Sequence, residues 1–346
     1  MTKTLLPLPI GVQTFEIIRQ DNLLYVDKTS RLEELVKNCR RVFLSRPRRF
    51  GKSLTLSTLD ALFSGKAELF RGLAAEAWVA EQAKHPAPVL RLDMSMMNVS
   101  DVAQFEGSLN SALTWRAEDA GVTLSSQQPS DKFQELIRAL HRQGGPVVVL
   151  IDEYDKPILD KIGNLEAAEA MRGSLRTLYT VLKGCDEYLR FVMLTGISKF
   201  TKTGVFSAMN NLMDISMTER FGDIVGYTQD ELERDFADWI DDAAGKMRLS
   251  RQEFLMQTKD YYDGFCFDGT TRLYNPFSIL NLLANRRFSN YWYESGSPSF
   301  IVAYMKRHDI LDPEAYRHLV VKESFASSQE IERARPESFL YQAGYL

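Results

Sequence analysis

The sequence predicts an α/β fold with a doubly wound parallel sheet, followed by a smaller helical region. Mainly apolar runs occur at residues 42–44, 146–151 and 188–195, the last with Arg190 near its start, as in strands that are buried on both faces. Segments with apolar residues at helical spacing lie between these runs, and such alternation builds parallel sheets through right-handed crossovers. The 346 residues exceed one average domain, so we expect two domains, residues 1–226 and 227–346.

The first strand leads into a basic loop and then a helix, in the stretch RRVFLSRPRRFGKSLTL at residues 40–56. Phosphate-binding loops (P-loops) have this arrangement, because backbone N–H groups and the positive helix end hold phosphate oxygens. Lys52 would reach the terminal phosphates, and the Ser53 hydroxyl would meet Mg²⁺. The alternative is an ordinary amphipathic helix with Lys52 in solvent. We predict nucleotide contacts from Arg46, Arg48, Arg49, Phe50, Gly51, Lys52, Ser53 and Leu54.

A second motif, GPVVVLIDEYDK at residues 145–156, ends a buried strand in two acids. Open α/β sheets bind ligands at the carboxyl ends of their strands. We therefore predict that Asp152 holds Mg²⁺ and that Glu153 polarises the attacking water. The next strand ends at Thr195, which we predict as a sensor of the γ-phosphate, with Ser198 as second choice. The alternative for Asp152 and Glu153 is an ordinary charged loop after a buried strand. The alternative for Thr195 and Ser198 is a helix cap.

The remaining elements follow from turn and capping signals. Upstream of the P-loop, Phe15, Ile17 and Tyr25 are candidates for an adenine pocket, with plain core packing as the alternative. Ser30 and Glu33 have capping-box spacing and predict a helix over 31–38. Further helices are expected at 54–63, 68–83, 102–120, 132–142, 166–183, 229–240, 251–262 and 277–284, and a further strand at 89–93. Short helices with small strands after residue 227 favour a lid, and a winged helix is one hypothesis for it.

The composition excludes several classes of protein. With 42 basic and 46 acidic residues, the net charge of −4 gives no global reason to expect nucleic-acid binding. Cys39, Cys185 and Cys266 lie far apart without CxxC spacing, which argues against disulfides and zinc and indicates a reducing, cytoplasmic compartment. No run reaches the roughly 20 apolar residues of a membrane span.

Several motifs together resemble one family. They are LLYVDKT, SRPRRFGKSL, LIDEYDKPI, LTGISKF, YYDGF and YNPFSILNLL, and the similarity runs from about residue 8 to 346. The combination resembles the AAA-ATPase-like proteins of bacteria and archaea, P-loop ATPases related to the AAA+ and STAND groups. The usual P-loop pattern, GxxxxGK[ST], has its first glycine where this chain has Arg46. The family's loop is similarly rich in arginine and proline and also lacks that glycine, which accounts for Arg46. The resemblance implies phosphate and Mg²⁺ roles for Lys52 and Ser53, acidic-strand roles for Asp152 and Glu153, and the sensor position for Thr195.

The resemblance also bears on the end of the chain. Many members carry a C-terminal domain that resembles PD-(D/E)XK nucleases. We expect this chain, which stops at residues 339–346, to lack that domain, and we assign it no nuclease activity.

These observations lead to one functional hypothesis, a Mg²⁺-dependent ATPase whose hydrolysis of ATP drives a conformational switch. Its cofactors would be ATP and Mg²⁺, and nucleic-acid processing or defence is our hypothesis for the process. One alternative is a non-hydrolysing ATP-binding switch or scaffold that regulates a partner, against which the Asp152–Glu153 pair argues. Another is a small-molecule kinase. As partners we expect nucleic acid or a protein and a homo-oligomer, with no membrane.

Overall fold

A computed structural model describes residues 5–198 and 211–291. The chain forms two compact units, each assembled from separate stretches. The first comprises Met1–Asn38, Arg48–Lys84 and Asp214–Ser297; the second comprises Cys39–Pro47, His85–Met213 and Pro298–Leu346. This grouping by contact differs from the division at residue 226, which stays a prediction about domains. Residues 292–346 of the predicted second domain lie outside the described residues.

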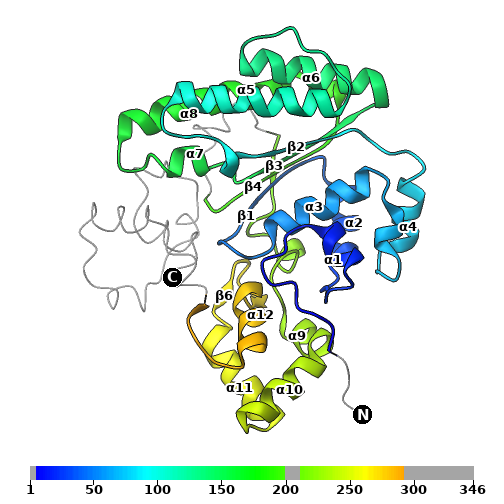
Figure 1. The fold of residues 1–346 in the computed structure, drawn as a ribbon, viewed down its shortest axis with the longest axis vertical. Helices are drawn as coiled ribbons and strands as arrows, with labels where there is room; N and C mark the ends of the chain where they lie inside the picture. Colours follow the sequence, from blue (N-terminus) through cyan, green and yellow to red (C-terminus); the bar gives the residue numbers. More distant parts are fainter. Residues whose placement is uncertain (1–4, 199–210, 292–346) are drawn as a thin grey trace. The chain divides into compact units, whose positions relative to one another are not determined.

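A five-stranded sheet forms the centre of the second unit (Figure 1). Its order is β2 (Val89–Asp93), β3 (Val147–Asp152), β4 (Leu189–Gly196), β1 (Arg41–Ser45) and β5 (Met213–Asp214). The pairs β2–β3, β3–β4 and β4–β1 are parallel. Every residue of β3 is buried, as its unbroken apolar run requires. The predicted α/β fold with a doubly wound parallel sheet is confirmed.

The strand register brings the candidates Asp152 and Thr195 to one edge, together with a further strand-end acid, Asp93. Asp93 at the end of β2 is the register partner of Asp152 at the end of β3. Ile151 pairs with Leu194, one residue before Thr195 in β4. Because parallel strands all end at the same edge, the acids and the threonine are gathered by the pairing itself.

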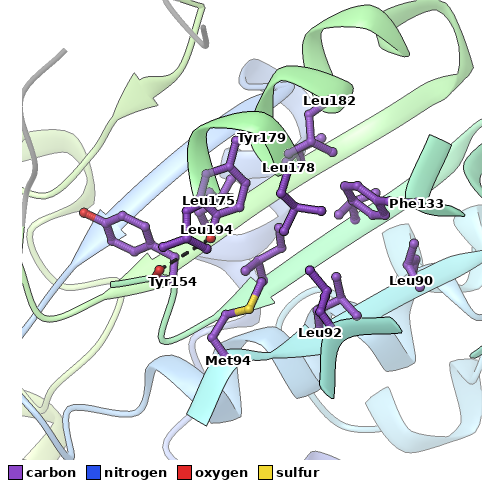
Figure 2. Packing of buried hydrophobic residues seen from close by; sticks show 14 of the residues in the cluster. Leu90, Leu92, Met94, Phe133, Tyr154, Leu175, Leu178, Tyr179, Leu182 and Leu194 are labelled. Carbon is purple, nitrogen blue, oxygen red and sulfur yellow. Dashed lines mark hydrogen bonds between the residues drawn. The ribbon is translucent and has the colours of Figure 1, made fainter. Parts of the chain in front are cut away.

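Helices pack along the sheet of the second unit: α5 (Val102–Asp119), α6 (Pro129–Gly144), α7 (Lys156–Leu159) and α8 (Leu165–Gly184). Figure 2 shows Leu90, Leu92 and Met94 in the same apolar cluster as Phe133 of α6 and the α8 leucines 175, 178 and 182. All these side chains are buried in one continuous core, so the strands that end in Asp93 and Asp152 are held in place by tight packing. The sequence did not predict α7, which is a single turn.

A carboxylate on α6 fixes the connection between α5 and α6. Glu135 accepts hydrogen bonds from the Ser125 N–H at 3.0 Å, the Ser126 N–H at 2.8 Å and the Ser125 hydroxyl at 2.9 Å. These donors favour the ionised carboxylate and lower the pKa of Glu135 from 4.5 to about 2. The depressed pKa stabilises the fold above pH 4.5, and that stabilisation is lost as the pH falls through about 2.

Glu135→Gln is therefore expected to lower the urea midpoint of unfolding at pH 7, because the amide accepts fewer hydrogen bonds and carries no charge. The difference from wild type should shrink steadily below pH 4.5 and vanish near pH 2. Urea titrations at several pH values measure it, with the exposed Glu118→Gln as the control. A difference that stays constant with pH would contradict the proposed source of the stability.

The first unit is helical apart from one small hairpin. Its elements are α1 (Phe15–Gln20), α2 (Thr29–Asn38), α3 (Lys52–Phe63), η1 (Ala67–Phe70), α4 (Glu76–Gln82), η5 (Glu219–Phe221), α9 (Gln229–Asp235), α10 (Ala237–Met247), α11 (Arg251–Tyr262), the strands β6 (Phe265–Cys266) and β7 (Arg272–Leu273), and α12 (Pro276–Asn285). Leu24 and Val26 from the N-terminal stretch pack in one core with buried residues of α9 to α12. Among the described residues, no helix is both long and apolar enough to span a bilayer.

Three predicted helix boundaries in this unit are wrong. The helix expected at 68–83 is divided into η1 and α4, because Gly72 adopts a positive φ of 78° between them. The capping box at Ser30 does not form, since α2 begins at Thr29, whose N–H donates to Asp27. The helix expected at 229–240 breaks at Phe236 into α9 and α10, although a capping box formed by Thr228 and Glu231 starts α9.

Candidate functional site

The helix α3 begins at Lys52, directly after Gly51 of the loop motif. Gly51 precedes the helix with φ of 98°, a conformation that glycine adopts without strain. The first N–H groups of an α-helix point out of its N-terminal end, and this positive end favours an anion. Lys52 is only 6 % exposed, so the alternative with this side chain in solvent is wrong. Ser53 and Leu54 are half-buried in the same turn.

The loop before α3 is anchored by later segments of the same unit. The Gly226 N–H donates to the Phe50 carbonyl at 3.1 Å, and the Asn275 side-chain amide donates to the Arg48 carbonyl at 3.3 Å. The Arg49 guanidinium lies 4.0 Å from the centre of the Phe277 ring, within cation–π range. Burial and the neighbouring Arg48 lower the pKa of Arg49.

An aromatic cluster holds the last residue of this loop. The buried Phe50 ring meets Phe265 and Phe267 edge-on, with ring centres 4.8 and 5.5 Å away. Gly226 has φ of 84°, and a Cβ atom there would lie 3.1 Å from the Phe50 ring. The turn-rich segment YYDGFCFDG therefore contributes packing partners of the loop, a role that its sequence alone did not reveal.

A pocket opens beside the first turns of α3 within the first unit. Its empty volume is about 540 Å³, counting the open space at its mouth. Leu54, Thr55 and Thr58 of α3 line it, together with Phe50 and Gly51 just before the helix. The other walls come from Pro9, from residues 24–26 and Lys28, from residues 224–227, and from single residues of α1, α2 and α12.

The three candidates for an adenine pocket have different places. Tyr25 lines the pocket, and burial raises the pKa of its phenol, so the hydroxyl is uncharged. Phe15 instead packs on Tyr25 and Phe70 in the core, with ring centres 5.3 and 4.9 Å apart. Ile17 is 43 % exposed and is not part of the lining. Of these candidates, only Tyr25 can contact a ligand in the pocket.

An ion pair that the sequence did not reveal lies at the pocket wall. The Lys28 ammonium contacts the Glu231 carboxylate at 2.6 Å, and both side chains are 12 % exposed. Burial lowers the pKa of Lys28, although Glu231 opposes the shift. Glu231 also accepts from the Thr228 N–H in the capping box of α9. The only local sequence patterns at these two residues are the segment LLYVDKT, which contains Lys28, and the capping-box spacing of Thr228 and Glu231.

In the second unit, the structure brings two predicted residues together at the strand ends. The buried Thr195 hydroxyl donates to Oδ1 of Asp152 at 2.5 Å, and the Glu153 N–H donates to the same oxygen at 3.1 Å. Glu153 is half-buried and has φ of 49°, uncommon for a residue with a side chain. Asp93 accepts instead from Ser95 in its own turn.

Two other candidates in this unit have local partners. Ser198 donates its hydroxyl to Asp155 at 2.5 Å, so Thr195 rather than Ser198 is bonded to Asp152. The Arg46 side chain is buried, with 1 % of the residue exposed. Its backbone N–H donates to the Gly196 carbonyl at 3.1 Å, which continues the β1–β4 pairing past Ser45. The residue in place of the usual first glycine is thus part of the sheet edge.

Gly196→Ala is expected to destabilise the protein by about 1–3 kcal/mol, the usual cost of overpacking. A Cβ atom at Gly196 would lie 2.6 Å from the Tyr154 ring and 2.7 Å from an Asp155 oxygen. Gly173→Ala on α8 is the matched control, because nothing lies within 4 Å and alanine favours a helix. Chemical unfolding measures both variants; equal stabilities would contradict the tight contact at Gly196.

Comparison with known proteins gives one family and several similar chains. Residues 9–206 match the family model AAA-ATPase_like, described as a predicted AAA-ATPase. An "Uncharacterized protein in vnfD 5'region" of Azotobacter chroococcum mcd 1 is 40 % identical over 341 residues. The match covers 98 % of this chain and 63 % of that protein, so this chain spans less than two thirds of its relative.

Two solved structures are more distantly similar. The Aeropyrum pernix ORC1 protein in complex with DNA has 12 % identity and a TM-score of 0.38, over 82 % of this chain and 64 % of that one. Cdc6p from Pyrobaculum aerophilum has 10 % identity and a TM-score of 0.34, over 89 % of this chain and 64 % of that one.

Proposed function

Because this chain belongs to the AAA-ATPase-like family of predicted AAA-ATPases, we propose that it binds ATP with Mg²⁺ and hydrolyses it to ADP and phosphate. The observation that carries the proposal is the pocket that opens at Gly51, where α3 begins. An apolar pocket next to a helix N-terminus suits a ligand with a flat apolar base and a polyanionic tail.

Each part of the nucleotide has a proposed binding group in the first unit. The base would occupy the pocket against Tyr25, Val225 and Tyr227. The phosphates would lie at the N–H groups of residues 51–54, with Lys52 on the terminal phosphates. The position of Lys52 supports this role, because it is the first residue of α3, where the positive helix end favours phosphate.

The residues proposed for Mg²⁺ are Ser53 and Asp152, whose hydroxyl and carboxylate oxygens suit this ion. The described residues contain no cluster of three or more metal-ligating His, Cys, Asp or Glu side chains. Mg²⁺ commonly has one or two protein carboxylates and completes its shell with phosphate and water, so a small donor set fits. When bound, Mg²⁺ would neutralise phosphate charge.

The proposed chemistry rests on the strand ends of the second unit. The Glu153 carboxylate would orient the attacking water and accept its proton as the γ-phosphoryl group is transferred. Thr195 would keep the Asp152 carboxylate oriented through its 2.5 Å hydrogen bond. A conformational switch, a nucleic-acid or protein partner, a homo-oligomer and a cytoplasmic location remain predictions.

Ligand titrations on the full chain test this proposal. We expect ATP to bind more tightly than tripolyphosphate, which lacks the base, and more tightly than AMP, which lacks the terminal phosphates. Mg²⁺ should strengthen ATP binding, and phosphate release should require Mg²⁺. Equal affinity for ATP and tripolyphosphate would contradict a base in the pocket. Tight Mg²⁺–ATP binding without phosphate release would instead favour the non-hydrolysing switch.

A further inference from the structure

A buried carboxylate outside the proposed chemistry lies three residues after Asp152. Asp155 is 1 % exposed, and its Oδ2 accepts three hydrogen bonds. The donors are the Ile197 N–H at 3.0 Å, the Ser198 N–H at 2.8 Å and the Ser198 hydroxyl at 2.5 Å. All three belong to the turn that directly follows β4. One side chain thus satisfies and fixes that turn.

The residue before Asp155 holds the same stretch from its other side. The Tyr154 N–H donates to the Thr195 carbonyl at 3.0 Å, and the Tyr154 hydroxyl donates to the Ser198 carbonyl at 2.9 Å. Tyr154 is itself fixed, because its ring meets Phe43 edge-on. Its carbonyl also accepts a hydrogen bond from the Tyr179 hydroxyl at 3.4 Å (Figure 2). The anchors of the turn therefore belong to the core of the second unit.

Thr195 lies inside this anchored stretch. Its carbonyl is bound by Tyr154, and its hydroxyl is bound to Asp152. The next residue is Gly196, where any side chain would collide with Tyr154 and Asp155. Pairing with β1 holds Thr195 and Gly196 on one side. The turn that Asp155 holds fixes the chain directly after them, so the pairing and the turn together determine where the Thr195 hydroxyl meets Asp152.

We propose that Asp155 is a positioning residue for ATP hydrolysis, which fixes the end of β4 so that the Thr195 hydroxyl orients Asp152. The inference rests on the proposed function, because Asp152 is there the acid that holds Mg²⁺. Asp155 contacts no reacting group in this scheme and acts through Thr195. Burial raises the pKa of Asp155, whereas the hydrogen bonds from Ser198 and Ile197 lower it. A buried carboxyl group is costly to ionise, which is why it needs these specific hydrogen-bond donors.

The geometry distinguishes two substitutions at this position. All three donors converge on one oxygen, so the single amide oxygen of Asp155→Asn can accept the same hydrogen bonds. Asp155→Ala removes the acceptor and leaves the two N–H groups of the turn buried without it. We expect Asp155→Ala to lower kcat about 100-fold, the loss that a displacement of about 1 Å can cause, with an ATP Kd within about threefold of wild type. Asp155→Asn should restore most of kcat.

A double-mutant cycle separates positioning from a general structural role. In a Thr195→Val background the positioned hydroxyl is gone, so adding Asp155→Ala should lower kcat by less than about threefold further. The exposed Asp160→Ala, in the same segment, is the control and should leave kcat unchanged. Additive losses, or an Asn variant as impaired as the Ala variant, would overturn the proposal.

Two further measurements keep the test decisive. Should Asp155→Ala fail to fold, Ser198→Ala removes only one of the three donors, and it should lower kcat by a few fold while ATP affinity stays unchanged. If the wild type releases no phosphate, the proposed hydrolysis is refuted. The double-mutant cycle of Asp155→Ala and Thr195→Val is then measured by the urea midpoints of unfolding. Non-additive midpoints would then sustain the positioning of Thr195 by Asp155, and additive midpoints would overturn it.

Discussion

Lys52→Ala is expected to weaken ATP binding about 10- to 100-fold, since a charge-assisted hydrogen bond contributes about 1.5–3 kcal/mol and each 1.4 kcal/mol is tenfold in affinity. Lys52 is the first residue of α3, directly after Gly51, and its side chain is buried. A lysine in solvent elsewhere would therefore not supply the lost charge at this position. AMP binding should change far less, because AMP lacks the terminal phosphates that Lys52 would contact. Calorimetric titration of both nucleotides measures the difference.

The control for this variant is Lys66→Ala in the same unit. Its side chain is 43 % exposed and pairs with Glu16 on the surface, so its loss should leave ATP affinity unchanged. Unfolding curves establish that both variants are folded. Tight ATP binding by the Lys52 variant would refute the assignment of residues 46–54 as the phosphate loop.

Glu153→Gln should retain ATP binding within about threefold and lower kcat by about 10²–10⁴, the usual contribution of a general base. The amide keeps the size of the side chain and cannot accept the proton of the attacking water. Both residues meet the same backbone requirement at φ of 49°, so the strand end should keep its shape. Single-turnover phosphate release, paired with nucleotide titration, reports both quantities.

The exposed Glu187→Gln is the matched control and should leave both quantities unchanged. A Glu153 variant that hydrolyses ATP at the wild-type rate would remove this residue from the chemistry. If wild type and variant both bind ATP and neither releases phosphate, the chain acts as a nucleotide-dependent switch.

The parallel sheet and its acidic edge could be predicted from local sequence because both depend on short, continuous patterns. The run from Val147 to Ile151 has no polar residue, which only a strand covered on both faces tolerates. Asp152 and Thr195 each end such a run, so parallel pairing had to bring them to one edge. The GKS triplet after a strand likewise predicted a helix beginning near Gly51, and α3 begins at Lys52.

The pocket could not be predicted, because its walls come from segments that are distant in sequence. Phe15 and Tyr25 are both aromatic and both buried, yet only Tyr25 lines the pocket. Tertiary packing decides this difference, since Phe15 is enclosed by Tyr25 and Phe70. The pairing of Lys28 with Glu231 spans 203 positions, which no local pattern can indicate. The anchors of Arg48 and Phe50 are equally remote.

The interleaved construction of the first unit has a consequence for biosynthesis. The Arg48 carbonyl is bound by Asn275, which leaves the ribosome 227 residues later. Contacts this distant in sequence must await the late chain and close long loops, which slows folding. The loop before α3 therefore stays without its contacts to Gly226 and Asn275 until most of the chain has been made. A fragment ending at residue 206, where the family match ends, would contain the loop's signature without the segments that hold it.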